Sequence, residues 1–195
     1  MHEHDQPLVD DLDPRHRIAL AYAPKAARPA WYALLLLERK LADAARPGRD
    51  PMMIQLRLAW WRDRLAEDAE HWPVSEPAFA HLKAWRGEHR CLSALVDGWE
   101  ASIVGEDEGR ELAAARVASY VALAELLGAG SPEVVRSAVN DIDNPQTASP
   151  LPTPVPRAMR PLAVLRAFAV REVRGGKPTP FADLVRVMRA GLLGR

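Results

Sequence analysis

Four prolines in this chain each follow a residue whose side chain can cap the start of a helix. The side-chain oxygen of such a residue accepts hydrogen bonds from unpaired backbone N–H groups, and proline fits the first helical turn, where its missing N–H costs nothing. The four pairs are Asp13-Pro14, Asp50-Pro51, Ser131-Pro132 and Thr179-Pro180. They predict four helix starts and so constrain the chain to a largely helical fold.

The segments that follow these starts have the apolar spacing of helices. Ile54, Leu58, Trp61 and Leu65, for example, recur at steps of three and four residues, which places them on one helix face. No alternating β-branched run with a tight hairpin turn is present, so we expect an all-α fold. The predicted helices cover residues 14–22, 25–46, 51–69, 76–86, 88–103, 109–128, 131–141, 157–173 and 180–191.

The main interruption of this helical pattern is a proline-rich break over residues 144–156. Five prolines within this segment forbid a continuous helix, because each lacks a backbone N–H and clashes with the preceding turn. We expect an extended crossing or a mobile loop here. The length of 195 residues is typical of a single domain, so the prediction is one all-helical domain over residues 1–195 that contains this break.

Charge and cysteine content exclude several classes of protein. The 26 basic and 26 acidic residues balance, which removes the electrostatic case for binding nucleic acid. The single cysteine, Cys91, excludes an intramolecular disulfide framework and a four-thiolate zinc site.

The first residues lack a signal-peptide pattern, and no apolar run approaches the ~20 residues that span a bilayer. We therefore expect a cytoplasmic protein without a transmembrane segment, and peripheral contact with the inner membrane stays open.

Two segments resemble a known family. Residues 20–43 place Pro24 and the run Arg28-Pro29-Ala30 ahead of a long aromatic and aliphatic helix, and residues 53–65 read MIQLRLAWWRDRL. The first segment resembles the first helical hairpin of the squalene/phytoene synthase family. The second resembles a divergent branch that includes bacterial phytoene-synthase-like proteins and a mitochondrial complex I assembly factor. Residues 160–192 are also similar to the C-terminal part of bacterial members.

The resemblance implies a shortened isoprenoid-synthase-like helical bundle. The family condenses two prenyl diphosphates, and two aspartate clusters hold the magnesium ions that neutralise the diphosphate leaving group. This chain departs from both clusters. The first keeps only Asp43 and has Arg46 at the last acidic position, and the second offers only Asn140, Asp141 and Asp143. The expected cofactor is therefore none, with Mg²⁺ required only if transferase activity survives.

The candidate metal ligands are Asp43 and Glu38. Their spacing of five residues turns Glu38 well off the face of Asp43. The pair is either a residual magnesium site or a solvated acidic pair beside Arg39, Lys40 and Arg46.

The candidate ligand-binding residues are basic and aromatic. Guanidinium groups match phosphate oxygens, so Arg28, Arg39 and Arg57 could hold a diphosphate. Arg57 is otherwise part of a charged outer face with Arg62, Asp63 and Arg64, where ion pairs are weak. Trp60 and Trp61 could line a prenyl tunnel, or they could pack in the core, because Trp61 joins the Ile54 stripe and Trp60 lies about 100° round at its edge. The remaining candidate is Tyr120, within a Tyr-Val-Ala run similar to one in the family.

These features give one main functional hypothesis and two alternatives. The main hypothesis is a non-catalytic family member that binds an isoprenoid diphosphate, another lipid, a partner protein or a second copy of itself. The first alternative is an active prenyl-diphosphate transferase with Asp43, Glu38, Asp141 and Asp143 as metal ligands. The second, by analogy with the mitochondrial relative, is an assembly factor for a respiratory membrane complex.

Overall fold

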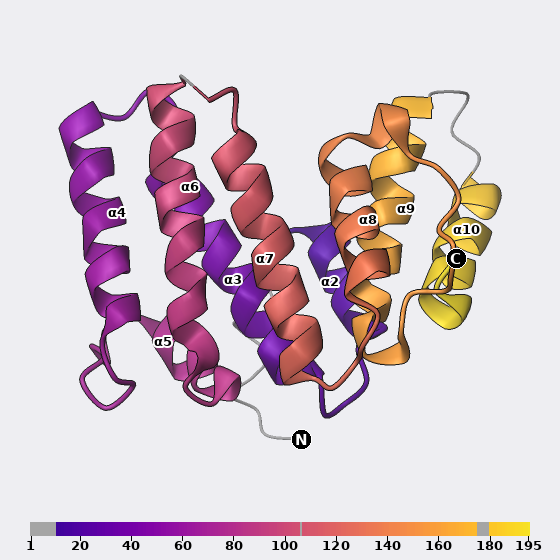
Figure 1. The fold of residues 1–195 in the computed structure, drawn as a ribbon, viewed down its shortest axis with the longest axis horizontal. Helices are drawn as coiled ribbons and strands as arrows, with labels where there is room; N and C mark the ends of the chain where they lie inside the picture. The colour runs from indigo at the N-terminus through magenta and orange to yellow at the C-terminus, as the bar shows by residue number, and fades with distance from the viewer. Residues whose placement is uncertain (1–10, 106, 175–179) are drawn as a thin grey trace. The chain divides into compact units, whose positions relative to one another are not determined.

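All regular secondary structure in the described residues is helical (Figure 1), which confirms the predicted all-α fold. The computed structural model describes residues 11–105, 107–174 and 180–195. The α-helices are α2 (Pro14–Ala21), α3 (Arg28–Ala44), α4 (Pro51–Ala66), α5 (Pro77–Leu82), α6 (Ser93–Val104), α7 (Arg110–Leu126), α8 (Pro132–Asp143), α9 (Arg160–Arg174) and α10 (Pro180–Leu193). No helix in these residues is long and apolar enough to cross a bilayer.

The helix starts follow the predicted capping pattern at Asp13 and Asp50. The Asp13 carboxylate accepts from the backbone N–H groups of Arg15 and His16, and the Asp50 carboxylate accepts from Met52 and Met53. The helix start predicted at Ser131-Pro132 is confirmed, because α8 begins at Pro132. The capping contact expected there is absent, since the Ser131 backbone is left-handed (φ 57°) and its side chain makes no capping hydrogen bond. Thr179 lies outside the described residues.

Three predicted helices are shorter or more irregular than the sequence suggested. The chain before α3 forms a turn in which the Ala27 N–H donates to the Pro24 carbonyl at 2.9 Å, so this helix begins at Arg28 rather than at residue 25. Residues 83–85 and 88–92 form the 3-10 helices η1 (Lys83–Trp85) and η2 (Glu88–Leu92). Gly87 between them has φ 95°, a left-handed conformation that interrupts helix growth at little cost only for glycine.

The helices divide into two compact units, which are described separately. The first contains the described residues of 11–28 and 123–195, and the second contains residues 29–122. The division falls within α7, after Ala122. The expectation of a single domain stays a prediction.

In the first unit, α9 is the central helix. It packs against α2, α8 and α10, and α8 and α10 lie beside it in Figure 1. Its residues 161–165 are all buried. An ion pair of 2.6 Å joins Arg15 of α2 to Glu172 of α9. These contacts make α9 the helix around which the unit is organised.

The proline-rich break connects α8 to α9 in this unit. It contains one 3-10 turn, η3 (Pro145–Thr147), and no α-helix, as its prolines predict. The break is held in place, because Val155 is fully buried and its N–H donates to the Gly194 carbonyl at 3.0 Å. Arg166 also joins the Ser149 carbonyl to the Asp141 carboxylate. The segment is thus an anchored crossing.

In the second unit, α3 supplies most of the core. Its residues 30–37 are all buried, and Leu41 continues the buried face. The fully buried Trp85 donates its indole N–H to the Ala30 carbonyl at 3.2 Å, which fixes η1 against the start of α3. The Trp31 ring packs against Tyr120 of α7, with ring centroids 5.6 Å apart.

The helix α4 packs against α6 in the same unit. Arg62 of α4 forms ion pairs with Asp97 and Glu100 of α6. On its inner side, α4 contributes Trp61 to a cluster of rings with Phe79 and Trp72. These contacts fix α4 at the edge of the unit and leave its Met52, Met53, Leu56 and Trp60 side chains exposed.

Candidate functional site

A cleft of about 400 Å³ lies between the C-terminal half of α3 and the face of α4 in the second unit. A volume of this size is within the range of small-molecule sites, ~300–1,000 Å³. The lining residues are Lys40, Asp43, Ala44, Leu56, Arg57, Trp60, Trp61 and Glu76. Half of these are apolar and half are charged, so the cleft offers both an apolar wall and an ionic rim.

The apolar wall is formed mainly by the two neighbouring tryptophans of α4. Trp61 is only 5% exposed, whereas Trp60 is 39% exposed, because Trp60 lies one helix position round from the buried stripe. The two rings meet edge to face at 5.1 Å between centroids, and Trp60 also contacts Phe79 at 5.7 Å. The buried rings therefore support Trp60, whose partly exposed ring can take up an apolar ligand.

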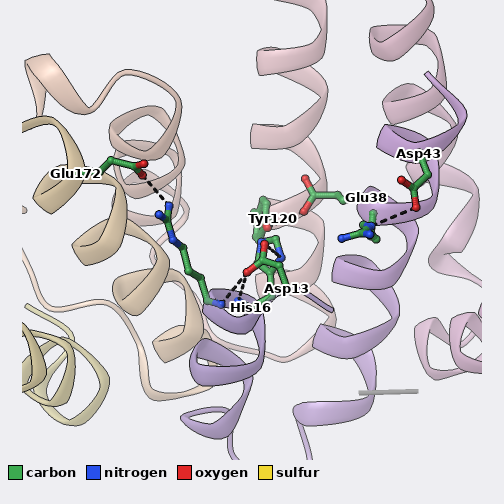
Figure 2. Close-up of polar contacts among 8 residues, drawn as sticks. Asp13, His16, Glu38, Asp43, Tyr120 and Glu172 are labelled. Carbon is green, nitrogen blue, oxygen red and sulfur yellow. Dashed lines mark hydrogen bonds and ion pairs between the residues drawn. The ribbon is translucent and has the colours of Figure 1, made fainter. Parts of the chain in front are cut away.

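Three of the four charged residues in the cleft are engaged with other groups of the protein. Lys40 forms an ion pair of 3.1 Å with Glu76, and Glu76 also caps α5 by accepting from the Ala78 N–H. Asp43 accepts from Arg46 at 2.6 Å and from Arg39 at 3.2 Å. Both oxygens of the Asp43 carboxylate are thus held by guanidinium groups, and Figure 2 shows one of these contacts at Asp43.

Arg57 differs from the other charged residues of the cleft. Its side chain is exposed, and among the described residues it has no ion pair. Counted with the two arginines that hold Asp43, the cleft and its rim carry four basic side chains and two acidic ones. This surplus favours an anionic group beside the tryptophans.

The second acidic candidate, Glu38, faces α7 and lies outside the cleft lining. One of its oxygens accepts from the Tyr120 hydroxyl at 2.8 Å, and the other accepts from Arg116 at 3.1 Å. Figure 2 shows Glu38 beside Tyr120 and Asp43 further along α3. The two acids point to different partners, as their five-residue spacing predicted.

These contacts bear on whether Asp43 and Glu38 could hold magnesium. A magnesium site needs carboxylate oxygens that are free to face the ion, and all four oxygens of this pair accept hydrogen bonds from other side chains. Within residues 11–105, 107–174 and 180–195, no three His, Cys, Asp or Glu side chains gather. The two acids as arranged do not fit a magnesium cluster.

The structure brings together four of the eight residues predicted for the site, namely Asp43, Arg57, Trp60 and Trp61. Arg39 adjoins them through Asp43. Glu38 and Tyr120 form a separate contact, and Arg28 lies at the first residue of α3, where it donates to the Ala23 carbonyl at 3.2 Å. These placements leave the functional roles of the eight residues as predictions.

The sequence analysis did not identify Lys40, Ala44, Leu56 and Glu76 as site residues. Lys40 lies three positions before Asp43, and this helical spacing is a signal that it shares the same face. Glu76 precedes Pro77 and accepts from the Ala78 N–H, so it is a capping residue before proline like Asp13 and Asp50. Its presence in the cleft depends on the loop between α4 and α5, which local sequence patterns do not define.

The acidity of Asp43 gives a test of this arrangement. Partial burial raises the pKa of Asp43, but the hydrogen bonds from Arg46 and Arg39 outweigh it and hold that pKa below its ordinary value of 3.8. A lowered pKa stabilises the folded protein at neutral pH, and this contribution is lost as the pH falls below 3.8 and through the folded-state value.

We therefore expect Asp43→Asn to lower the free energy of unfolding at neutral pH and to have little effect in strong acid. The loss is less than about 1 kcal/mol, because solvent screens this partly exposed group. Urea denaturation at the two pH values measures it. The control is Asp63→Asn, an exposed aspartate on α4 that should change stability at neither pH. An equal loss for Asp43→Asn at both pH values would contradict the ion-pair account.

No family model, curated protein or solved structure matches this chain.

Proposed function

We propose that this chain is a divergent, shortened and non-catalytic relative of the squalene/phytoene synthases, and that it binds an isoprenoid diphosphate in the cleft between α3 and α4. One observation carries the proposal. Arg57 is a cation without an ion pair among the described residues, and it lies in the same cleft as the exposed edge of Trp60. An anionic head group with an apolar tail is complementary to this combination.

The head group would bind at the basic side of the cleft. Guanidinium donors form short, charge-assisted hydrogen bonds with phosphate oxygens. Arg57 is available for such bonds without breaking an ion pair to any residue that the structure describes. Arg39 and Arg46 form ion pairs with Asp43. They would add positive electrostatic potential at the head group while these ion pairs stay in place.

The apolar tail would bind along the apolar wall of the cleft, which α4 supplies together with the last residue of α3. Trp60, Trp61, Leu56 and Ala44 form this surface, and burying apolar area there contributes about 25 cal/mol per Å². The Trp60 ring is supported from behind by Trp61 and Phe79. Its exposed part, 39% of the residue's surface, is where a chain of methyl and methylene groups would pack.

The state of the acidic residues supports a non-catalytic role. Family chemistry needs clustered aspartates that carry magnesium. Here Asp43 is held by two arginines, Glu38 by Arg116 and Tyr120, and Asp141 by Arg166 at 2.6 Å. We therefore propose binding that needs no Mg²⁺ and no release of pyrophosphate. The active-transferase alternative requires these acids to exchange their arginine partners for metal.

Calorimetric titration with farnesyl diphosphate tests this proposal. We expect the wild type to bind, Arg57→Gln to weaken binding by about tenfold or more because a hydrogen bond to a charged group is lost, and Trp60→Ala to weaken it several-fold. The matched control is Arg136→Gln, an exposed arginine on α8 in the first unit, which removes the same charge and should leave binding unchanged.

Two results would contradict the proposal. The first is no binding of farnesyl diphosphate by the wild type. The second is an equal loss for Arg57→Gln and Arg136→Gln, which would mean that attraction by net charge, rather than a site at Arg57, holds the ligand.

A further inference from the structure

The outer face of α10 carries a dense set of exposed apolar side chains. Five of its residues are each between 43% and 64% exposed: Leu184, Val185, Met188, Leu192 and Leu193. Single exposed apolar residues are common on protein surfaces, but a contiguous patch marks an interaction site. This patch lies in the first unit and shares no residue with the cleft.

The helix α10 has a second, separate apolar face that anchors it. Val187, Ala190 and Gly191 are buried, and Gly191 lies so close to Tyr22 that an added Cβ would be 2.1 Å from its ring. At 100° per residue, Leu184, Val185, Met188 and Leu192 fall within an arc of about 100° beside this buried face. The buried residues already hold α10 against the rest of its unit. The exposed apolar residues are therefore not needed to anchor the helix.

Positive charge accompanies the exposed apolar face. At the same 100° per residue, Arg189 lies about 40° beyond Val185, at the edge of this arc, and Arg186 lies about 60° further round. Both side chains are exposed. The acidic residue Asp183 accepts from Arg171 of α9 at 2.6 Å and from Arg186 at 3.0 Å. Its negative charge is thus shared between two arginines, and the exposed part of α10 is basic.

We propose that this face of α10 binds the surface of an anionic lipid bilayer, with the helix lying in the plane of the interface. Apolar side chains flanked by arginines match the boundary between acyl chains and phosphate head groups. The 14 residues of α10 extend about 21 Å at 1.5 Å per residue, less than the ~30 Å of a bilayer core. The helix is therefore suited to lie on a membrane rather than to cross it.

A bilayer fits this face better than a protein partner does. The exposed apolar residues of this arc extend from Leu184 to Leu192, along most of the helix, and Arg189 gives the arc a basic border. A bilayer needs only these two features, whereas a partner protein would need a matching groove. An acidic amphipathic partner is the competing occupant, and the experiment below distinguishes the two.

The test is co-sedimentation of the full chain with phosphatidylcholine vesicles that contain or lack phosphatidylglycerol. We expect binding to the vesicles that contain phosphatidylglycerol, weaker binding to phosphatidylcholine alone, and release by salt, since screening shortens the reach of the arginines. The double variant Leu184→Ser/Met188→Ser should bind at least about tenfold more weakly, and Arg189→Gln should lose part of the preference for phosphatidylglycerol.

A second double variant controls for loss of exposed apolar area elsewhere. Met52→Ser/Met53→Ser removes two side chains that are 69% and 48% exposed on α4 and do not line the cleft. It should bind vesicles as the wild type does. Far-ultraviolet circular dichroism checks that each variant is folded.

Three results would overturn the proposal. They are no binding of the wild type to either vesicle, full binding by the folded Leu184→Ser/Met188→Ser variant, and an equal loss in the α4 variant. The first would leave a protein as the occupant of this face. None of them depends on whether farnesyl diphosphate binds the cleft, so the two proposals fail independently.

Discussion

Replacing Trp31 by alanine is expected to lower the free energy of unfolding by about 3–5 kcal/mol. Trp31 lies in the first turn of α3, is fully buried, and packs against the Tyr120 ring. Its removal deletes a large apolar side chain and leaves a cavity that close-packed neighbours fill only in part. Urea denaturation followed by circular dichroism measures the loss.

The matched control for Trp31 is Trp60, the same residue type at the edge of the core. Trp60 is 39% exposed, so Trp60→Ala should cost about 1 kcal/mol, mainly from its ring contacts with Trp61 and Phe79. The two variants should therefore differ in what they lose. Trp60→Ala is expected mainly to lower the affinity for farnesyl diphosphate, and Trp31→Ala is expected mainly to lower the free energy of unfolding. Similar stability losses would contradict the placement of one tryptophan in the core and the other in the cleft.

Adding a single methyl group at Gly98 is expected to destabilise the protein by about 1–3 kcal/mol. Gly98 is buried within α6, and a Cβ there would lie 2.7 Å from the Leu112 Cα and 3.0 Å from the Leu112 backbone nitrogen. Both are backbone atoms of α7, which cannot rotate away as a side-chain tip could. The Gly98→Ala variant must therefore push the two helices apart.

The expected loss of stability in Gly98→Ala is opposite in sign to the usual effect of replacing a helical glycine by alanine. In an unconstrained helix, alanine is more favourable than glycine by about 1 kcal/mol, so Gly98→Ala would otherwise raise stability. The control on the same helix is Ile103→Ala, a residue that is 40% exposed, which should cost less than Gly98→Ala although it removes more atoms. A Gly98→Ala variant that is as stable as the wild type, or more stable, would contradict the close approach of α6 to α7.

The helices were predictable because their signals are local. Asp13 and Asp50 cap helices within three residues of themselves, and the Ile54, Leu58, Trp61 and Leu65 stripe is buried as its spacing required. The failure at Ser131 is also local, since a left-handed backbone at this residue leaves its hydroxyl without a capping contact. The helix start itself was predicted correctly there, because α8 begins at Pro132.

The candidate site was predictable only in part, because its contacts join distant parts of the chain. Arg57, Trp60 and Trp61 were each singled out from the sequence, and all three line the cleft with Asp43. The pairing of Glu38 with Tyr120 spans 82 residues, and no local pattern predicts it.

The most direct test of the account is to titrate farnesyl diphosphate into the wild type in the presence of magnesium and again in the presence of a chelator, with pyrophosphate release followed in parallel. We expect the same affinity under both conditions and no pyrophosphate, because Asp43, Glu38 and Asp141 accept hydrogen bonds from the protein's own side chains. Binding that requires magnesium, accompanied by release of pyrophosphate, would contradict it and would identify the protein as a transferase.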